Sequence, residues 1–399
     1  MRDLKHLIAF ENLLQETNNE LVRQGKADGK RALGYTCYFM PEVLLDLPGC
    51  FAVRLRAPKC TSPDMATYYM SSRTCHYGRS LFERALEGGY NFLDADFGTE
   101  TCTVTCRFQE HLGYMDVIQN PDFFVTFTDV PFKRNQNSIE HYEGQLQAHV
   151  LDPLHEKFGI DISDEALMKA IDLHNEISAV INEIGDYRKL DNPTITGYEF
   201  QVIQLCSLVC PKELILPMLK ETAKELKTRK PDKKSPFRCK VVLAGSENDD
   251  PYFTELIESC GALVVADRYC YGSFPGRQEI VLTDGEDALT QVCRWYLQHT
   301  ECPRQSALHR VQYRNDHVAQ LVHDFKADGA IYEQMKFCTY WSYERVIANQ
   351  IMPRDYGIHI LSIDRPYIAG QSGQLRTRVQ AFVESLEMKQ LRSAQKEDN

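Results

Sequence analysis

The sequence predicts an α/β protein of two domains, each built on a parallel sheet, with a helical N-terminus and a helical connecting region. In residues 239–399, short apolar runs alternate with amphipathic segments of helical length. The first half repeats this alternation less regularly, and residues 136–230 are strongly helical in pattern. Strands that alternate with helices are typical of a parallel sheet with helices on both faces. At 399 residues the chain is also about twice the size of a common domain.

The first domain follows an N-terminal helix. Residues 1–30 predict this helix because charged and apolar residues alternate there at helical spacing. After it, four segments have the apolar character of strands, and three amphipathic segments between them are predicted helices. The predicted strands are residues 32–39, 51–57, 90–96 and 122–130, and the predicted helices are residues 41–47, 79–88 and 105–115.

A helical region separates the two domains. Its clearest amphipathic run is "DEALMKAIDLHNEISAVINEI", residues 164–184. The charged, Pro-punctuated segment "KTRKPDKKSP", residues 227–236, ends the region and marks the boundary. The predicted divisions are an N-terminal helix (1–30), a first α/β domain with a helical extension (31–200), a helical linker (201–238) and a second α/β domain (239–399).

The second domain has the clearer pattern. "CKVVLAG", residues 239–245, is a short apolar run that ends in Gly, as a buried parallel strand does. The helix that follows it has Pro251 near its start and Gly261 at its end. The further predicted strands are residues 262–267, 330–338 and 358–364, and the predicted helices are residues 250–261, 286–300, 315–329, 340–351 and 373–392.

Composition and motifs exclude several classes of function. The net charge of −11 argues against a nucleic-acid partner held by phosphate neutralisation. No apolar stretch approaches the roughly 20 residues of a membrane span, and the N-terminus lacks the apolar core of a secretory signal. We therefore expect a cytoplasmic protein without a membrane partner. The sequence has no G-x-x-x-x-G-K-[ST] motif and no G-x-G-x-x-G motif after a strand, so it signals neither a nucleotide hydrolase nor a dinucleotide dehydrogenase. It also has no C-x-x-C pair of the kind found in zinc sites.

The fourteen cysteines are a large number for a cytoplasmic chain, where disulfides are disfavoured. Ligands of open parallel sheets bind at the carboxyl ends of the strands, and this rule ranks the thiols. Cys338 and Cys102 follow predicted strands, and Cys75 precedes a predicted helix at the mouth of the first sheet. Three such thiolates can hold three irons of a [4Fe–4S] cluster and leave the fourth iron open to water or substrate.

Other cysteines leave alternatives open. Cys106 lies four residues after Cys102, so the two thiols share one helix face and either could be the ligand. Cys37 ends a predicted strand and is expected near the cluster without binding it. The remaining cysteines that we interpret as structural, in helices or at a strand start, are Cys206, Cys210, Cys239, Cys260 and Cys293.

Basic residues flank Cys75 in "SSRTCHYGRS". Arg73, His76 and Arg79 could favour the thiolate that metal ligation needs. Alternatively, Arg79 begins a solvated helix face and His76 caps the helix start.

The ordered motifs resemble those of the 2-hydroxyacyl-CoA dehydratase and benzoyl-CoA reductase family. The resemblance covers residues 30–390, nearly the whole chain. The motifs are "GYTCYFMPE", "SSRTC", "GTETC" followed by a helix, "MKFCTYWSYE", "GQLRTRVQAFVESL" and the helical "ISDEALMKAIDLHNEI" with "TGYEF".

The resemblance implies two Rossmann-like domains with a [4Fe–4S] cluster between them, bound by Cys75, Cys102 and Cys338. It favours Cys102 over Cys106 because Glu110 and Leu112 follow at the family's spacing. It also implies a pair of subunits, as a homo- or heterodimer, an acyl-CoA substrate and a separate ATP-dependent iron–sulfur activator. In the family that it resembles, one low-potential electron from the activator makes a ketyl radical of the thioester. This radical allows an anaerobic lyase to eliminate water, or a reductase to reduce an aromatic ring.

The sequence departs from the family pattern at "TCHYGRSL" and "CTVT". These departures leave open the acyl group and whether this subunit binds substrate. The alternative is a non-catalytic electron relay or a double-cubane cluster protein, for which extra thiols stand at Cys37, Cys60, Cys106 and Cys270. A plain α/β binding module with inert thiols is a third hypothesis. Arg54, Arg56 and Lys59 are candidate contacts for a CoA pyrophosphate, or else belong to a strand with a solvated face.

Overall fold

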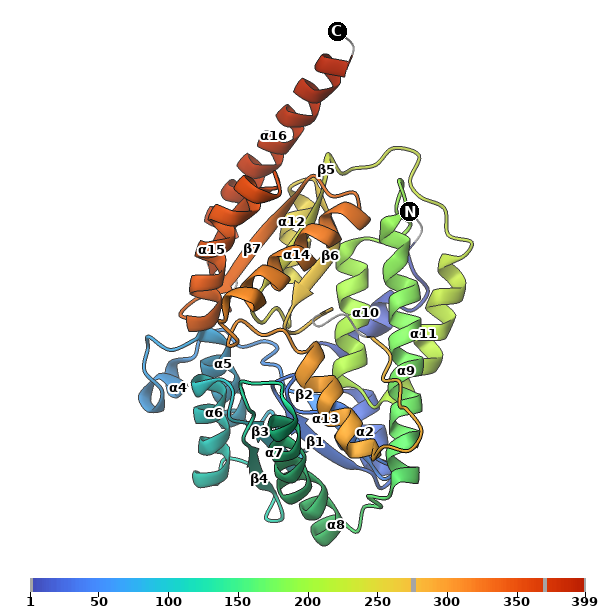
Figure 1. Ribbon diagram of the computed structural model, residues 1–399, viewed down its shortest axis with the longest axis vertical. Coiled ribbons are helices and arrows are strands. Elements are labelled where there is room, and N and C mark those ends of the chain that lie inside the picture. The colour runs from blue at the N-terminus through green and yellow to red at the C-terminus, as the bar shows by residue number, and fades with distance from the viewer. Residues whose placement is uncertain (1–2, 274–277, 369–371, 398–399) are drawn as a thin grey trace.

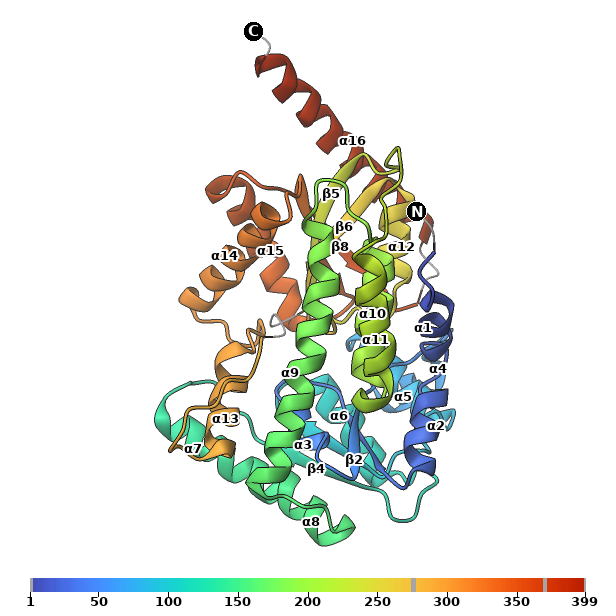
Figure 2. The same cartoon turned by 90° about the vertical axis from the view of Figure 1, so that its right-hand side faces the viewer.

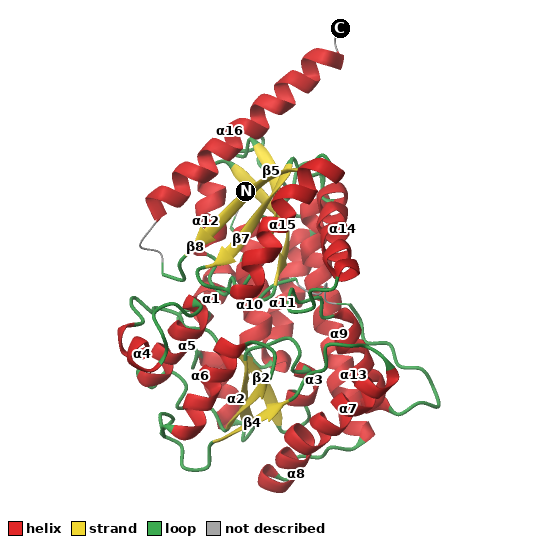
Figure 3. Cartoon of the chain, turned by 60° about the vertical axis from the view of Figure 1, so that its left-hand side comes forward, coloured by secondary structure: helices red, strands yellow, loops and turns green. Residues whose placement is uncertain are grey.

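The computed structural model describes residues 3–273, 278–368 and 372–397. It contains two four-stranded sheets, each entirely parallel, with helices packed around them (Figure 1). The predicted α/β class with two parallel sheets is therefore confirmed. Figure 3 shows the strands of both sheets enclosed by helices.

The first sheet has the strand order β2-β1-β3-β4. Its strands are β1 (Arg31–Tyr35), β2 (Cys50–Arg54), β3 (Ala95–Thr99) and β4 (Phe124–Thr128). The helices between and before them are α1 (Leu7–Leu13), α2 (Glu20–Ala27), α3 (Glu42–Leu45), α4 (Asp64–Tyr69), α5 (His76–Leu86) and α6 (Thr103–Tyr114).

The third strand begins later than residues 90–96 predict. Leu93 N donates to the carbonyl of Tyr90 in a turn, and the Asp94 carboxylate accepts from Ala32 N at 2.8 Å. Lys26 also pairs with Asp94. These contacts hold the apolar residues of this segment in a turn, so the ladder starts at Ala95.

The helical region contains α7 (Gln136–Leu146), a π-helical turn (Gln147–Leu151), α8 (Asp152–Phe158), α9 (Asp164–Asp186), a 3₁₀ turn (Tyr187–Lys189), α10 (Gly197–Val209) and α11 (Lys212–Leu226). Side chains fix where two of these helices begin. Ser163 accepts from Ala166 N at the start of α9, and Thr196 and Glu199 form a capping box at the start of α10. Helix α10 contacts both β2 and β6, so it joins the two sheets.

The second sheet has the strand order β6-β5-β7-β8. Its strands are β5 (Cys239–Gly245), β6 (Ala262–Tyr269), β7 (Gly329–Met335) and β8 (His359–Arg365). The helices after β5 in the chain are α12 (Tyr252–Ser259), α13 (Ala288–His299), α14 (Leu308–Asp324), α15 (Thr339–Asp355) and α16 (Ser372–Glu397). Helix α13 packs against α7 and α9 on the side of the first sheet (Figure 2). Helix α16 projects past the second sheet (Figure 1). Among the described helices, none combines the length and apolar content that a bilayer crossing requires.

Asp96 is a buried carboxyl in the central strand β3, and its protonation should make stability depend on pH. Gln109 Nε2 donates to Asp96 Oδ2 at 2.7 Å, and Asp96 Oδ1 has no hydrogen-bond partner. Burial raises the pKa of Asp96 to about 7 from its usual 3.8, although the Gln109 hydrogen bond opposes the shift. The folded state therefore holds the proton more tightly than the unfolded state, and stability falls as pH rises from about 4 to about 7.

Asp96→Asn should remove this pH dependence. We expect the variant and the parent protein to be close in stability at pH 4, and the variant to be more stable at pH 8 by on the order of 2–4 kcal/mol. Urea unfolding at both pH values measures the difference. A difference that does not grow between pH 4 and pH 8 would show that Asp96 is ionised in the folded protein.

Candidate functional site

The three predicted ligand cysteines occupy equivalent positions at the starts of three helices. Cys75, Cys102 and Cys338 are the N-cap residues of α5, α6 and α15, and none of their side chains forms a capping hydrogen bond. The amino end of a helix carries a partial positive charge, which favours anions. Three such ends therefore face the thiols, an arrangement suited to an anionic metal–sulfur group.

These three thiols line one cavity of about 70 Å³ between the two sheets. The lining comes from loops after strands of both sheets, as expected for ligand sites at carboxyl ends. Three further cysteines line the same cavity, which therefore holds six thiols. The lining residues are Thr36, Cys37, Cys75, Tyr77, Gly78, Thr101, Cys102, Val104, Thr105, Ser246, Glu247, Cys270, Cys302, Cys338, Tyr340 and Trp341.

Cys75 and Cys338 are in direct contact. The Cys338 thiol donates a hydrogen bond to Cys75, and this bond lowers the pKa of Cys75 while it raises that of Cys338. His76 N donates to the carbonyl of Lys336 at 3.1 Å, so the two loops are also joined through their backbones. Phe337, which precedes Cys338, has φ +66°. Such strain in a residue with a bulky side chain is often found at functional sites.

The structure distinguishes Cys102 from Cys106. Cys102 lines the cavity, whereas the Cys106 thiol donates to the carbonyl of Thr99 at 3.2 Å and does not line it. Burial raises the pKa of Cys102 to about 11. Tyr340 on α15 donates to the carbonyl of Thr101 at 3.2 Å and so holds the Cys102 loop against the second sheet.

The donor set of the cavity, six cysteine thiols, is of the chemical kind that holds an iron–sulfur cluster. In residues 3–273, 278–368 and 372–397, no three His, Cys, Asp or Glu side chains converge closely enough to hold one metal ion. The six thiols line one shared space, although Cys75 and Cys338 also contact each other across it. Cysteine sulfur is the usual ligand of such clusters. Cys75, Cys102 and Cys338 would hold the group, with Cys37, Cys270 and Cys302 as further thiols in reach of the same cavity.

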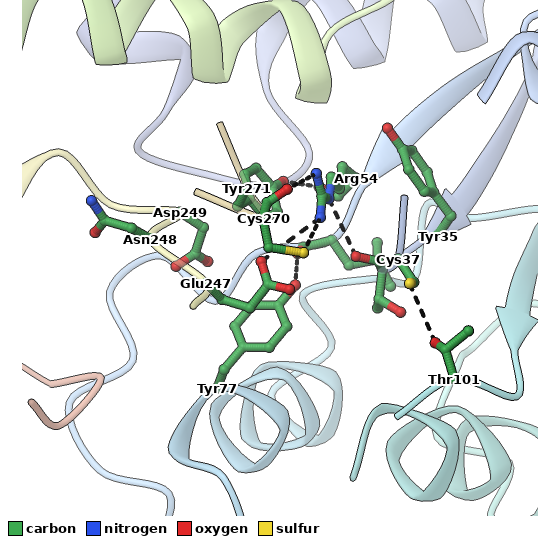
Figure 4. Close-up of polar contacts among 12 residues, drawn as sticks. Tyr35, Cys37, Arg54, Tyr77, Thr101, Glu247, Asn248, Asp249, Cys270 and Tyr271 are labelled. Carbon is green, nitrogen blue, oxygen red and sulfur yellow. Dashed lines mark hydrogen bonds and ion pairs between the residues drawn. The ribbon is translucent and has the colours of Figure 1, made fainter. Parts of the chain in front are cut away.

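The remaining cysteines have different environments. Cys37 lines the cavity and accepts a hydrogen bond from Thr101 Oγ1 at 3.3 Å (Figure 4). Cys60 packs into the apolar core beside α5 and does not line the cavity. The five cysteines interpreted as structural are all buried in apolar cores: Cys206, Cys210, Cys239, Cys260 and Cys293.

Sequence reasoning missed Cys302 and Glu247. Cys302 follows the predicted helix 286–300 and precedes Pro303, a loop position that could have marked it. Glu247 follows β5 by two residues, at the carboxyl end of a central strand. Burial raises the pKa of Glu247 to about 7, although Arg54 opposes the shift.

The basic residues near Cys75 differ in charge and exposure. Burial, together with Arg79 and Lys336, lowers the pKa of His76 to about 4, so His76 is neutral at pH 7. Arg79 is buried on α5 and donates to Thr67 Oγ1 at 3.1 Å, so it is not part of a solvated face. Arg73 is exposed. Arg79 is thus a buried cation of the Cys75 helix.

The two arginines of β2 and its following loop are not available to a CoA pyrophosphate. Arg54 and Arg56 are 1% and 4% exposed, so the alternative of a solvated strand face is also wrong. Arg56 donates to the carbonyls of Asp249 and Leu14 at 2.6 and 3.0 Å. Lys59 is 57% exposed and pairs with Glu16.

Comparisons with known proteins identify the family. The family model of the 2-hydroxyglutaryl-CoA dehydratase D-component matches residues 37–386. The (R)-phenyllactyl-CoA dehydratase beta subunit of Clostridium sporogenes is 23% identical over 94% of this chain and 97% of its own length. The (R)-2-hydroxyglutaryl-CoA dehydratase beta subunit of Acidaminococcus fermentans is 22% identical over 92% and 95%. One subunit of the benzoyl-CoA reductase of Thauera aromatica is 22% identical over 80% and 81%. A match of this extent places the chain in the 2-hydroxyglutaryl-CoA dehydratase D-component family.

Proposed function

We propose that this chain is the iron–sulfur subunit of an anaerobic, cytoplasmic 2-hydroxyacyl-CoA dehydratase, or of an enzyme similar to benzoyl-CoA reductase. In this proposal Cys75, Cys102 and Cys338 hold a [4Fe–4S] cluster. The observation that carries it is the convergence of these three thiols, each at the start of a helix, on one cavity between the sheets.

The partners follow from the relatives and from the sequence. Relatives named as beta subunits support a sister subunit for this chain. The chain has no phosphate-binding motif, so an ATP-dependent activator would be a separate protein. The relatives' names support an acyl-CoA thioester as the substrate of the assembled enzyme.

The residues of this chain supply binding, charge and exclusion of water. When bound, the cluster supplies the single electron that makes elimination of the 2-hydroxyl feasible. The three helix starts favour its negative charge. Cys75 is buried and Cys102 and Cys338 are partly buried, which limits their contact with water. The ring centroids of Phe337 and His76 lie 5.6 Å apart, so these two rings pack together where the loops that carry Cys75 and Cys338 meet.

A second candidate is a non-catalytic electron relay or a double-cluster protein. A double cluster with three thiolate ligands on each half would use six thiols, and six thiols line this cavity. The cavity of about 70 Å³ is also much smaller than the roughly 300–1,000 Å³ of ligand pockets. A thioester would therefore need room that a sister subunit supplies.

Turnover by the complete system tests the proposal. We expect no activity from the chain alone. Activity should appear under strict anaerobiosis with the activator, ATP, a strong reductant and the sister subunit. The assay uses a panel of 2-hydroxyacyl-CoA and aromatic CoA thioesters.

The matched control replaces the parent chain by Cys338→Ala in the same mixture, which should be inactive. If every thioester fails while the cluster is intact and reducible, the dehydratase assignment is wrong and the electron-relay function is favoured.

A further inference from the structure

Arg54 is a buried cation that joins the two sheets directly behind the cysteine cavity. It ends β2, and its side chain has no exposed surface. Its Nε donates to the carbonyl of Thr36 at 3.2 Å, and its Nη1 donates to the carbonyl of Cys270 at 2.7 Å (Figure 4). These bonds connect the loop after β1 with the loop after β6.

The same guanidinium faces two residues of the cavity wall. Its Nη2 lies 3.6 Å from Cys270 Sγ and 3.7 Å from Glu247 Oε2. Cys270 and Glu247 line the cavity, whereas Arg54 stands one layer behind them. Among the described lining residues, Glu247 alone carries a carboxylate.

Further contacts hold the guanidinium in place. It lies over the ring of Tyr271 at 4.3 Å from the centroid, and the Tyr271 hydroxyl donates to the carbonyl of Arg54 at 2.6 Å. A cation fixed by two backbone carbonyls and an aromatic ring cannot move away from the cavity to be screened by solvent. Its charge therefore acts on the cavity at low effective dielectric.

We propose that Arg54 is a positioning residue for the iron–sulfur group, and that Arg54 and Glu247 shift its reduction potential in opposite directions. The inference rests on the proposed function, because it concerns the group held by the thiols. Nearby charge and hydrogen bonds to cysteine sulfur set the potentials of iron–sulfur clusters. The cation favours the reduced, more negative state, whereas the carboxylate opposes it. The cation also fixes the Cys270 loop in place.

A redox titration followed by electron paramagnetic resonance tests this in the anaerobically prepared full chain. The titration is run at pH 8.5, above the pKa of Glu247 of about 7, so that Glu247 carries its charge. Arg54→Met should lower the midpoint potential, Glu247→Gln should raise it, and Arg54→Lys, which keeps the charge, should stay near the parent value. Glu258→Gln is the matched control, because Glu258 accepts from Gly197 N at 2.7 Å and does not line the cavity. It should leave the potential unchanged.

The outcomes separate this inference from the proposed function. Iron content of the parent chain reports on the proposed function, whereas the sign of the shifts reports on Arg54 and Glu247. An unchanged potential in Glu247→Gln, or shifts of the same sign in Glu247→Gln and Arg54→Met, would overturn the inference.

Hydrogen exchange of the iron-free chain gives a second readout. Residues 266–273 should exchange faster in Arg54→Met than in the parent, with partial rescue in Arg54→Lys. Equal exchange rates in all three proteins would refute the positioning role.

Discussion

Replacing Cys75, Cys102 or Cys338 by alanine is expected to abolish the iron–sulfur content of the chain. Each thiol projects from the start of a different helix into the same cavity. Loss of one ligand leaves only two of the three protein ligands proposed for the cluster. Iron and acid-labile sulfide, measured after anaerobic purification, should fall to near background in each variant.

Two cysteine variants serve as controls for this experiment. Cys206 is fully buried in a helical core and Cys106 does not line the cavity, so Cys206→Ala and Cys106→Ala should keep the parent's iron content. Circular dichroism distinguishes cluster loss from unfolding. Full iron content in Cys338→Ala would show that the ligands have been assigned wrongly.

Arg314→Met is expected to destabilise the chain by about 3–5 kcal/mol, because it leaves a buried carboxylate without its partner. Arg314 Nε and Nη2 donate to the two Glu344 oxygens at 2.6 and 2.7 Å, and both side chains are almost fully buried. Arg314 also donates to the carbonyl of Gln305 at 2.9 Å, close to Cys302 in the cavity wall. The variant should therefore loosen the loop that carries Cys302.

Chemical denaturation measures this loss, provided that the transition is a single cooperative one. The control is Arg354→Met, since Arg354 pairs with Asp355 in an exposed position and its loss should have no measurable effect. Equal denaturation midpoints for Arg314→Met and the parent would mean that the buried pair adds nothing to stability.

The parallel strands could be predicted from the sequence because buried strands are continuous apolar runs. "CKVVLAG" matches β5 residue for residue. The third strand could not be placed because Asp94 is engaged by Ala32 N and Lys26, contacts that only the folded chain brings together. The same holds for α13, whose helical pattern was clear but whose packing against α7 and α9 is tertiary.

The positions of the cysteines relative to the predicted strands and helices allowed three of the six cavity-lining thiols to be predicted. Cys75, Cys102 and Cys338 were predicted because each lies near the carboxyl end of a strand, and the structure brings them to one cavity. Cys302 and Glu247 were missed because their loops reach the cavity only through folding. Their positions, in the loop before Pro303 and after a predicted strand, could have marked them, but the sequence does not show that these two loops reach the same cavity.

The arginines of "AVRLRAPK" were misinterpreted for a different reason. Charged residues in a strand usually indicate a solvated face, but β2 is buried throughout. Arg54 and Arg56 can remain buried because backbone carbonyls of distant loops accept hydrogen bonds from their guanidinium groups. Sequence does not show these acceptors.

Iron and sulfide analysis of the anaerobically purified parent chain tests the central claim most directly. The claim predicts about four irons and four acid-labile sulfides per chain, with the charge-transfer absorption of a cluster. About eight irons would favour the double-cluster alternative on the six thiols. A folded chain that binds no iron after anaerobic purification and reconstitution would contradict the claim.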